Sequence, residues 1–244
     1  MLELPRELLA LLRQSKRVVA LTGAGVSQES GLRTFRDAQT GLWSQYKPED
    51  LASPDAFQRD PKLIWDWYAM RRARMAEVRP NPAHFALVEM ARRVPEFTLV
   101  TQNVDNLHWK AGSPQVIELH GNLGRVRCSQ DGRFVETWQE NGDVPRCPHC
   151  GAYLRPDVVW FGEQLPREAL EQAVQAARSC AVFFSIGTSG VVQPAASLAY
   201  AAKNRGATLI EVNPESTPLS PKADFVLTGK AGEILPALVT QTWG

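Results

Sequence analysis

Short strand-like runs of apolar residues recur along this chain, and helix-like stretches separate them. Four of these runs end in small or polar residues: RVVALTGAG (17–25), EFTLVTQNVD (96–105), AVFFSIGTS (181–189) and ATLIEVNPE (207–215). Two further runs are QVIELHG (115–121) and ADFVLTG (223–229). Near-continuous apolar strands that alternate with helices are typical of a parallel sheet covered by helices on both faces. The sequence therefore predicts an α/β fold in which ligands bind at the carboxyl ends of the strands.

Two regions interrupt this alternation. Residues 38–80 are helix-like and rich in Trp and Tyr, and residues 123–156 carry three of the four cysteines. We interpret both regions as inserts that form a smaller second lobe. The remaining segments, 1–37, 81–122 and 157–244, then make up the large domain.

Composition excludes some classes of partner and compartment. The chain of 244 residues is 44% hydrophobic, which is enough to build a sizeable core, and its formal net charge is +1. Without a long basic run, neither nucleic acid nor a membrane surface is an expected partner. The first residues predict an amphipathic helix that leads into a strand, with no cleavage site. A cytoplasmic location is expected, because the cysteines suit a reducing compartment. We expect Cys180 to be a buried core residue and the other three cysteines to suit a metal site.

The loop TGAGVSQESG after the first run is similar to the glycine fingerprint of dinucleotide-binding folds. Gly23 and Gly25 permit a tight turn and a close backbone approach to a diphosphate. The third glycine position of the fingerprint is occupied by Gln28, and no clear strand-end acid follows about 20 residues later. An ordinary hydride-transfer dehydrogenase is therefore disfavoured.

Three other strand-end loops carry polar side chains that suit a nucleotide. They supply amides, hydroxyls and carboxylates that can bind ribose hydroxyls or a carboxamide: Gln102, Asn103 and Asp105; Gly187, Thr188 and Ser189; Asn213 and Glu215. Each loop alone could be a plain turn, since these residue types dominate turns. Four such loops at strand ends together indicate a nucleotide site.

One histidine follows a predicted strand directly. His120 lies in the segment ELHGN, where a neutral imidazole with a pKa near 6.5 suits a general base for a ribose hydroxyl. Most isolated histidines are packed or exposed instead. A packing role is the better interpretation for His108, and His84 also has weaker context.

The cysteine spacing is similar to a zinc ribbon with one position altered. Cys128, Cys147 and Cys150 fit the pattern, and Asp131 stands where a second cysteine is expected. The fourth ligand could be Asp131, His149 or water, and the absence of any metal also stays open. Nothing nearby in the sequence offers a nucleophile or base together with an open coordination position, so a bound metal is expected to be structural.

The segment WDWYAMRRARM (65–75) places an arginine among apolar residues. On a helical wheel, Arg71 falls inside the apolar arc and Arg72 falls outside it. The arc consists of Leu63, Ile64, Trp67, Tyr68, Met70 and Met75, and Arg74 also falls within it. A buried guanidinium needs an acidic or polar partner, which either the protein or a ligand could supply.

Taken together and in order, six motifs resemble the sirtuins, the NAD-dependent protein lysine deacylases. The motifs are GAGVSQESGLRTFR, TQNVDNLH, ELHGN, PDVVWFGE, GTSGVVQP and VNPE. The resemblance implies a Rossmann-type NAD-binding domain formed by residues 1–37, 81–122 and 157–244. It also implies a small lobe made of a helical module (38–80) and a zinc-ribbon-like module (123–156). Acyl-lysine proteins or peptides would meet NAD between the lobes.

The resemblance also implies roles for single residues. The NAD site would consist of Gly23, Ala24, Gly25, Ser27, Phe35, Arg36, Gln102, Asn103, Asp105, Gly187, Thr188, Ser189, Asn213, Glu215 and Ala231. His120 would be the catalytic base, and Cys128, Cys147 and Cys150 would hold a structural zinc ion. Two segments would pair with the substrate backbone as an added strand: 158–163, with Val159, Phe161 and Gly162, and 190–193.

Sirtuins with Tyr-x-x-Arg in the helical module are specialised for acidic acyl groups such as succinyl and malonyl. Tyr68 and Arg71 match this pair. A planar guanidinium can bind a carboxylate through two hydrogen bonds, and a phenol can add a third. The expected activity is therefore NAD-dependent desuccinylation and demalonylation, with some deacetylation. The alternatives are mono-ADP-ribosyl transfer from NAD and a non-catalytic sensor of NAD or ADP-ribose.

Overall fold

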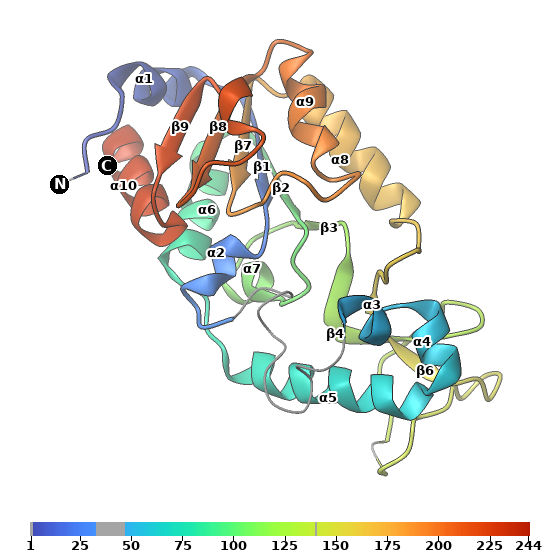
Figure 1. Ribbon diagram of the computed structural model, residues 1–244. Helices are drawn as coiled ribbons and strands as arrows, with labels where there is room; N and C mark the ends of the chain where they lie inside the picture. The colour runs from blue at the N-terminus through green and yellow to red at the C-terminus, as the bar shows by residue number, and fades with distance from the viewer. Residues whose placement is uncertain (1, 33–46, 140) are drawn as a thin grey trace.

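A six-stranded parallel sheet forms the centre of the large lobe (Figure 1). The computed structural model describes residues 2–32, 47–139 and 141–244. The sheet has the strand order β3-β2-β1-β7-β8-β9. Its strands are β1 (Arg17–Thr22), β2 (Glu96–Thr101), β3 (Ile117–Glu118), β7 (Val182–Ile186), β8 (Thr208–Asn213) and β9 (Phe225–Thr228). All six predicted strands are present, and the predicted parallel α/β fold is confirmed.

Helices cover both faces of this sheet because residues along each strand alternate between the two sides. In β1, Val18 and Ala20 pack into one apolar cluster, whereas Val19 and Leu21 pack into the other. The first cluster is covered by α1 (Arg6–Gln14), α6 (Pro82–Arg93) and α10 (Ala231–Trp243), and the second by α8 (Arg167–Ser179) and α9 (Ser197–Lys203). Cys180 is buried in the second cluster, as expected.

The edge strand β3 is much shorter than the apolar run QVIELHG predicts. Leu119 still donates its N–H to the Thr101 carbonyl at 2.9 Å. The chain then turns at Gly121, which has a φ of 79°. A side chain there would overlap the Asp157 carbonyl, so this turn requires glycine. The turn directs the chain out of the large sheet and into the small lobe.

The small lobe combines short helices with a second sheet. The antiparallel sheet has the order β5-β4-β6 and consists of β4 (Gly121–Cys128), β5 (Phe134–Val135) and β6 (Leu154–Val158). Its helices are α3 (Pro48–Leu51), α4 (Pro54–Arg59) and α5 (Pro61–Glu77). In Figure 1, α5 runs along the lower side of the molecule, next to α3, α4, β4 and β6. Three short helices complete the described fold: α2 (Gly25–Gln28), α7 (Leu107–Lys110) and the 3-10 helix Ser220–Lys222.

Helix α5 buries two faces, and the helical wheel predicted one. Trp65 packs into the cluster around the cysteines, while Trp67 and Tyr68 pack into the cluster with α3 and α4. Met70 is 46% exposed and Arg74 is exposed, so their assignment to a buried arc is wrong. A helix between two partners has apolar residues around most of its circumference, which removes the contrast that a wheel detects.

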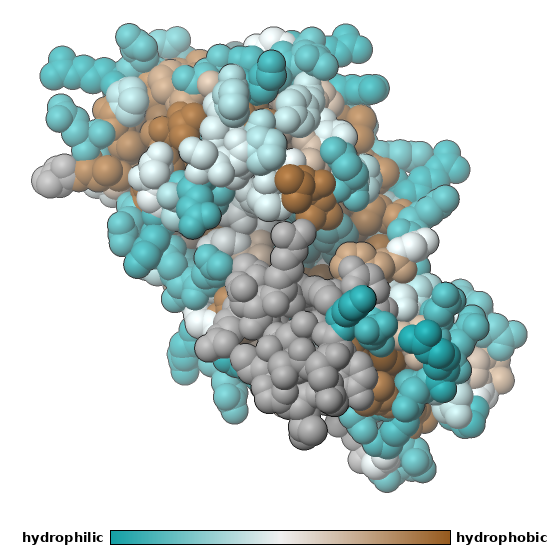
Figure 2. Space-filling model, viewed as in Figure 1, coloured by the Kyte–Doolittle hydropathy of each residue, from teal (hydrophilic) through white to brown (hydrophobic). Residues whose placement is uncertain are grey.

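The outer surface is mainly hydrophilic on the face that Figure 2 shows, with hydrophobic residues visible between polar ones. None of the helices in the described ranges has both the length and the apolar character needed to span a bilayer.

Candidate active site

Backbone contacts join the loops that follow β1 and β7. Gly25 donates its N–H to the Gly187 carbonyl at 2.8 Å. A Cβ added at Gly25 would lie 2.7 Å from the Gly187 Cα, and one at Gly23 would lie 2.8 Å from the Gly187 oxygen. Gly187 itself has a φ of 58°. The glycines are therefore required for this close approach of two strand-end loops.

A hydrogen-bonded trio joins the β1 loop to the β2 loop. Ser27 donates its hydroxyl to Asp105 Oδ2 at 2.7 Å, and Asn103 Nδ2 donates to Ser27 Oγ at 3.1 Å and to the Gly23 carbonyl at 3.0 Å. The other oxygen of Asp105 accepts from the Leu107 N–H at 2.9 Å. Burial raises the pKa of Asp105, and these hydrogen bonds oppose that shift. Residues far apart in the sequence are thus fixed at one edge of the sheet.

His120 is held in one tautomer by the backbone. Its Nδ1 lies 2.9 Å from the Gln102 carbonyl. A carbonyl can only accept, so Nδ1 carries the proton and Nε2 has a free lone pair. Burial lowers the pKa of His120, which keeps the ring neutral near pH 7. This is the protonation state and orientation that a general base needs.

The loops after β7 and β8 also meet. Thr188 is buried, and its hydroxyl accepts from the Gly190 N–H at 3.0 Å. Asn213 Nδ2 lies 3.5 Å from the Thr188 carbonyl and donates to the Glu215 carbonyl at 3.1 Å. The side chains of Ser189 and Glu215 are exposed. The predicted cofactor residues of these two loops therefore lie next to each other, at the carboxyl ends of the neighbouring strands β7 and β8.

Two further predicted cofactor residues, Ala24 and Ala231, lie at the β1 loop and at the start of α10. Ala24 is exposed in the β1 loop, and Ala231 begins α10 with a buried side chain. Glu29, in the segment after α2, accepts the Gly232 N–H at 2.7 Å and so connects the start of α10 to the β1 loop region. Phe35 and Arg36 lie outside the described residues.

Four polar side chains pack directly beneath the loops. The sequence did not single them out as a group. Thr22 Oγ1 lies 2.8 Å from Thr101 Oγ1 and 2.9 Å from His108 Nε2. The ring centroids of His84 and His108 are 4.9 Å apart, and both side chains are buried. The predicted packing role of His108 is confirmed.

Three thiols converge in the small lobe. Their sulfur atoms all lie within 4.8 Å of one another, and Cys128 Sγ is 3.5 Å from Cys150 Sγ. With Zn–S bonds of about 2.3 Å, a tetrahedral site separates its sulfurs by about 3.8 Å, so the spacing fits zinc. In the described part of the chain, neither Asp131 nor His149 joins this group. The Asp131 carboxylate accepts from the Arg133 N–H at 3.0 Å and also forms a side-chain hydrogen bond with the Cys128 thiol.

The segment after β6 lies against the histidine and against α5. Val159 donates its N–H to the His120 carbonyl at 2.9 Å, and the Phe161 side chain is 50% exposed. The next residue, Gly162, has a φ of 87°. Between Val159 and Phe161, the Trp160 indole points inward, and its Nε1–H donates to the Tyr68 hydroxyl at 3.0 Å. The predicted base and the predicted Tyr-x-x-Arg helix therefore contact neighbouring residues of one segment.

Arg71 is half-buried beside Tyr68. Its guanidinium lies 4.7 Å from the centroid of the Trp67 ring. Burial lowers the pKa of Arg71, and the nearby Tyr68 opposes that shift. Arg72, which the wheel placed outside the arc, is also half-buried, and its guanidinium lies 4.6 Å from the Trp65 ring on the other side of the helix.

Comparison with known proteins assigns the family. The model of the Sir2 family matches residues 23–194. This chain belongs to the Sir2 family. It is 48% identical over 242 residues to a protein from Pyrococcus abyssi named NAD-dependent protein deacylase, with 96% of each chain covered.

Solved Sir2 structures have the same fold as this Sir2-family chain. A crystal structure of a Sir2 homologue with NAD has a TM-score of 0.93 and 48% identity, covering 98% of this chain and 94% of the other. A Sir2 complex with a p53 peptide and NAD⁺ has a TM-score of 0.85 and 32% identity, covering 97% of each. The resemblance that the sequence motifs indicate is therefore confirmed.

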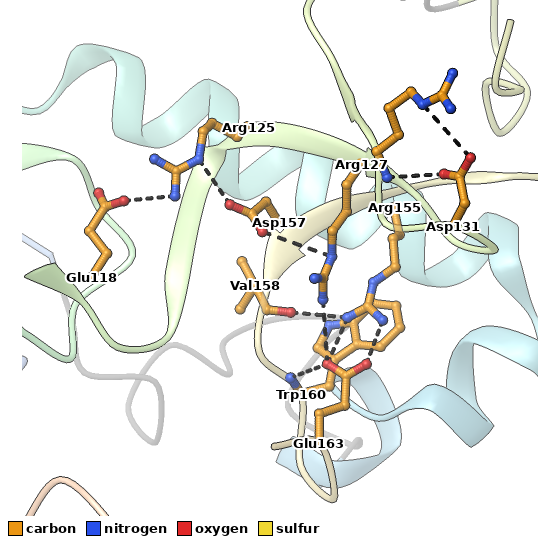
Figure 3. Close-up of polar contacts among 10 residues, drawn as sticks. Glu118, Arg125, Arg127, Asp131, Arg155, Asp157, Val158, Trp160 and Glu163 are labelled. Carbon is orange, nitrogen blue, oxygen red and sulfur yellow. Dashed lines mark hydrogen bonds and ion pairs between the residues drawn. The ribbon is translucent and has the colours of Figure 1, made fainter. Parts of the chain in front are cut away.

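Sequence reasoning did not single out three residues that contact one another beside Tyr68 in this Sir2-family chain. They are Arg155, Trp160 and Glu163, which Figure 3 draws in mutual contact. Arg155 is 7% exposed and Trp160 is 2% exposed. A charged residue inside the apolar-flanked motif LRPDVVWFGE was the available signal, because a buried arginine requires an acidic partner nearby.

The buried histidines predict an acid-sensitive fold. Burial lowers the pKa of His84 to about 4 and that of His108 to about 3. Both stay neutral in the folded chain, whereas in the unfolded chain they bind protons below about pH 6.5. Stability is therefore lost as the pH falls from 6.5 towards the folded pKa values. We expect each histidine to lower the free energy of unfolding by roughly 2 kcal/mol between pH 7 and pH 5.

Urea denaturation of the wild type and His108→Gln measures this effect. The difference in unfolding free energy between the two proteins should stay constant from pH 8 to pH 7. It should then change by roughly 2 kcal/mol from pH 7 to pH 5, because the variant lacks one titrating group. The same pH dependence in both proteins would show that His108 is not buried in its neutral form.

The cluster of three thiols, from Cys128, Cys147 and Cys150, predicts bound zinc. Elemental analysis of the purified protein should find about one zinc ion per chain, and Cys147→Ser should lose most of it together with thermal stability. Cys180→Ser is the matched control, because it removes a buried thiol that lies outside the group. Equal zinc in both variants would contradict the assignment. Asp131→Asn tests whether Asp131 completes the site in solution.

Proposed function

We propose that this chain is an NAD-dependent protein lysine deacylase with a preference for acidic acyl groups. The observation that carries the proposal is His120, whose Nδ1 is fixed on the Gln102 carbonyl while Nε2 makes no hydrogen bond within the described ranges. A neutral, oriented imidazole at the end of a parallel strand suits proton transfer from a ribose hydroxyl. The curated name of the Pyrococcus abyssi relative supports the same activity.

The strand-end loops are the proposed NAD site. Gly23, Ala24, Gly25 and Gly187 offer backbone without bulky side chains, which permits close approach to a diphosphate. Hydroxyl, amide and carboxylate groups of the neighbouring loops suit ribose hydroxyls and a carboxamide. We assign the nicotinamide half to Ser27, Phe35, Arg36, Gln102, Asn103 and Asp105, and the adenosine half to Thr188, Ser189, Asn213, Glu215 and Ala231. The NAD complex of a Sir2 homologue with a TM-score of 0.93 supports this assignment.

Bound NAD supplies an electrophilic ribose carbon that accepts the acyl oxygen. The chain contributes the proton transfer: His120 Nε2 takes a proton from a ribose hydroxyl while Nδ1 stays bonded to Gln102. The Ser27–Asp105–Asn103 hydrogen bonds keep the loops of β1 and β2 in a fixed relation. Free lysine, nicotinamide and O-acyl-ADP-ribose are the expected products.

The peptide is proposed to bind along residues 158–163 and 190–193. Phe161 and Val191 are 50% and 49% exposed, which is unusual for large apolar residues and suits a surface that a ligand covers. Val159 and Gly162 would contribute backbone hydrogen bonds to an added strand. The solved Sir2 complex with a p53 peptide supports a peptide substrate.

Tyr68 and Arg71 are the proposed determinants of acyl preference. They project from adjacent turns of α5, three residues apart, and Tyr68 contacts the residue between Val159 and Phe161. A guanidinium and a phenol at this position suit the carboxylate of a succinyl or malonyl group. The proposal therefore puts the acyl end of a lysine bound along the 158–163 segment next to Tyr68 and Arg71.

The proposal also covers how the chain is divided. We assign residues 1–37, 81–122 and 157–244 to the NAD-binding domain, 38–80 to the helical module and 123–156 to a module held by zinc. The described cysteines form no disulfide, which suits a reducing compartment, and we propose a cytoplasmic location.

A panel of acyl-lysine peptides tests the activity. Peptides carrying acetyl-, malonyl- or succinyl-lysine are incubated with the protein, with and without NAD, and free lysine is quantified by mass spectrometry. We expect NAD-dependent removal of all three groups, fastest for succinyl and malonyl. The absence of any NAD-dependent release would refute the enzyme assignment, and ADP-ribose attached to protein without deacylation would indicate ADP-ribosyl transfer instead.

A further inference from the structure

Tyr68 is fixed by a residue that sequence reasoning passed over. The side chain is 1% exposed, and its hydroxyl accepts the Trp160 Nε1–H at 3.0 Å. In the described part of the chain, this is the one hydrogen bond that the Tyr68 hydroxyl makes. Trp160 thus determines how the phenol is oriented.

Trp160 is itself held on several sides (Figure 3). Glu163 accepts the Trp160 backbone N–H at 2.8 Å. The Arg155 guanidinium lies 3.4 Å from the centroid of the indole ring, and Phe57 packs with a centroid distance of 5.3 Å. The indole therefore has little freedom to rotate.

The pair Arg155–Glu163 fixes this arrangement. Arg155 donates to both carboxylate oxygens of Glu163, at 2.6 and 2.9 Å, and its Nη2 also donates to the Val158 carbonyl at 3.0 Å. Two parallel charge-assisted hydrogen bonds restrict the geometry more than a single contact does. Arg127 lies 3.9 Å from the same carboxylate, which adds a second cation on this side.

The direction of the Trp160–Tyr68 hydrogen bond has a chemical consequence. An indole N–H can only donate, so the Tyr68 oxygen must accept, and the phenol proton must point away from Trp160. Burial raises the pKa of Tyr68 to about 12, which keeps that proton in place near neutral pH. A donor that already accepts one hydrogen bond is polarised into a stronger donor.

We propose that Trp160 is a positioning residue that makes Tyr68 a one-directional hydrogen-bond donor towards the acidic end of the acyl group. The proposal rests on the proposed deacylase function and extends it to a residue outside the Tyr-x-x-Arg pair. Arg155 and Glu163 act through Trp160 by holding the indole. Removal of the indole N–H lets the Tyr68 hydroxyl rotate, and the preference for acidic acyl groups then weakens.

The ratio of kcat/KM for succinyl-lysine to kcat/KM for acetyl-lysine measures this preference. We expect Trp160→Phe, which keeps an aromatic ring but removes the donor, to lower the ratio by about 5- to 10-fold, mainly through KM for the succinyl peptide. Trp65→Phe is the matched control, because it trims a buried indole on the other face of α5. Its ratio should stay within about twofold of the wild type.

A double-variant cycle separates positioning from packing. In the Tyr68→Phe background, Trp160→Phe should change the ratio by less than about twofold, because no phenol remains to be oriented. A merely structural Trp160 would lower both activities alike in either background and leave the ratio unchanged. If Trp160→Phe does not fold, Glu163→Gln tests the same positioning, since it leaves one acceptor oxygen where Arg155 and the Trp160 N–H now share two and removes the charge that pairs with Arg155. We expect a roughly threefold lower ratio for Glu163→Gln.

Two outcomes would overturn the proposal, and they are distinguishable. A wild-type protein that removes no succinyl group with NAD would refute the proposed acyl preference and this inference with it. A wild type that prefers succinyl, combined with an unchanged ratio in Trp160→Phe or in its substitute Glu163→Gln, would refute only the role of Trp160.

Discussion

Replacement of His120 by glutamine should slow NAD-dependent removal of acyl groups by about 10²- to 10⁴-fold. Glutamine can still donate a hydrogen bond to the Gln102 carbonyl, which His120 Nδ1 contacts at 2.9 Å. It cannot take up a proton in the way a neutral imidazole does. The variant therefore separates orientation of the site from proton transfer. The measurement is the rate of lysine release from a succinyl peptide at saturating NAD.

Two controls accompany this variant. Thermal unfolding should be close to that of the wild type, and calorimetric titration should show NAD affinity changed by less than about tenfold, because His120 is not expected to supply most of the binding energy. A variant that folds, binds NAD and keeps more than about a tenth of the activity would contradict the role of His120 as general base.

Arg71→Met should reduce succinyl removal by about 30- to 1,000-fold and acetyl removal far less. A bidentate contact between a guanidinium and a carboxylate is worth roughly 2 to 4 kcal/mol, which corresponds to that range. Methionine keeps a long apolar stem that can still pack near Trp67, over which the Arg71 guanidinium lies at 4.7 Å. The measurement is kcat/KM on matched succinyl- and acetyl-lysine peptides.

Arg72→Met is the matched control, because Arg72 is also half-buried and its guanidinium lies over an aromatic ring, that of Trp65. Its cation lies on the side of α5 that faces the cysteine module, so it should affect both substrates alike. Equal loss on succinyl and acetyl peptides in Arg71→Met would return Arg71 to a structural role.

Much of the fold was predictable because strand burial leaves a strong signal. Each of the six predicted runs contains a strand of the parallel sheet, and Val18 to Leu21 alternate between two covered faces. Sequence periodicity gave wrong predictions where the environment of a residue was determined by another helix or strand. Helix α5 lies between two clusters, so its wheel misplaced Met70 and Arg74. The early end of β3 depends on Gly121, whose turn direction is determined by the approach of Asp157 from β6.

The site was predictable in its residue types more than in its contacts. Strand-end placement brought Asn103 and Asp105 into consideration, because parallel strands end at the same edge, and the resemblance to the sirtuins added Ser27. Which side chains bond each other was not predictable, since Ser27 and Asp105 are 78 residues apart. The same reason explains why Trp160 was overlooked. Its partner Tyr68 lies 92 residues earlier, and alternation along a strand shows only that Trp160 points opposite to Val159 and Phe161.

Product stoichiometry tests the central claim most directly. A succinyl-lysine peptide is incubated with NAD, and nicotinamide, free lysine and O-succinyl-ADP-ribose are quantified together by mass spectrometry. The proposed chemistry predicts equal amounts of all three at every time point, because each acyl group is transferred to one ribose. Free lysine without nicotinamide release, or nicotinamide release with ADP-ribose attached to protein and the peptide still acylated, would contradict it.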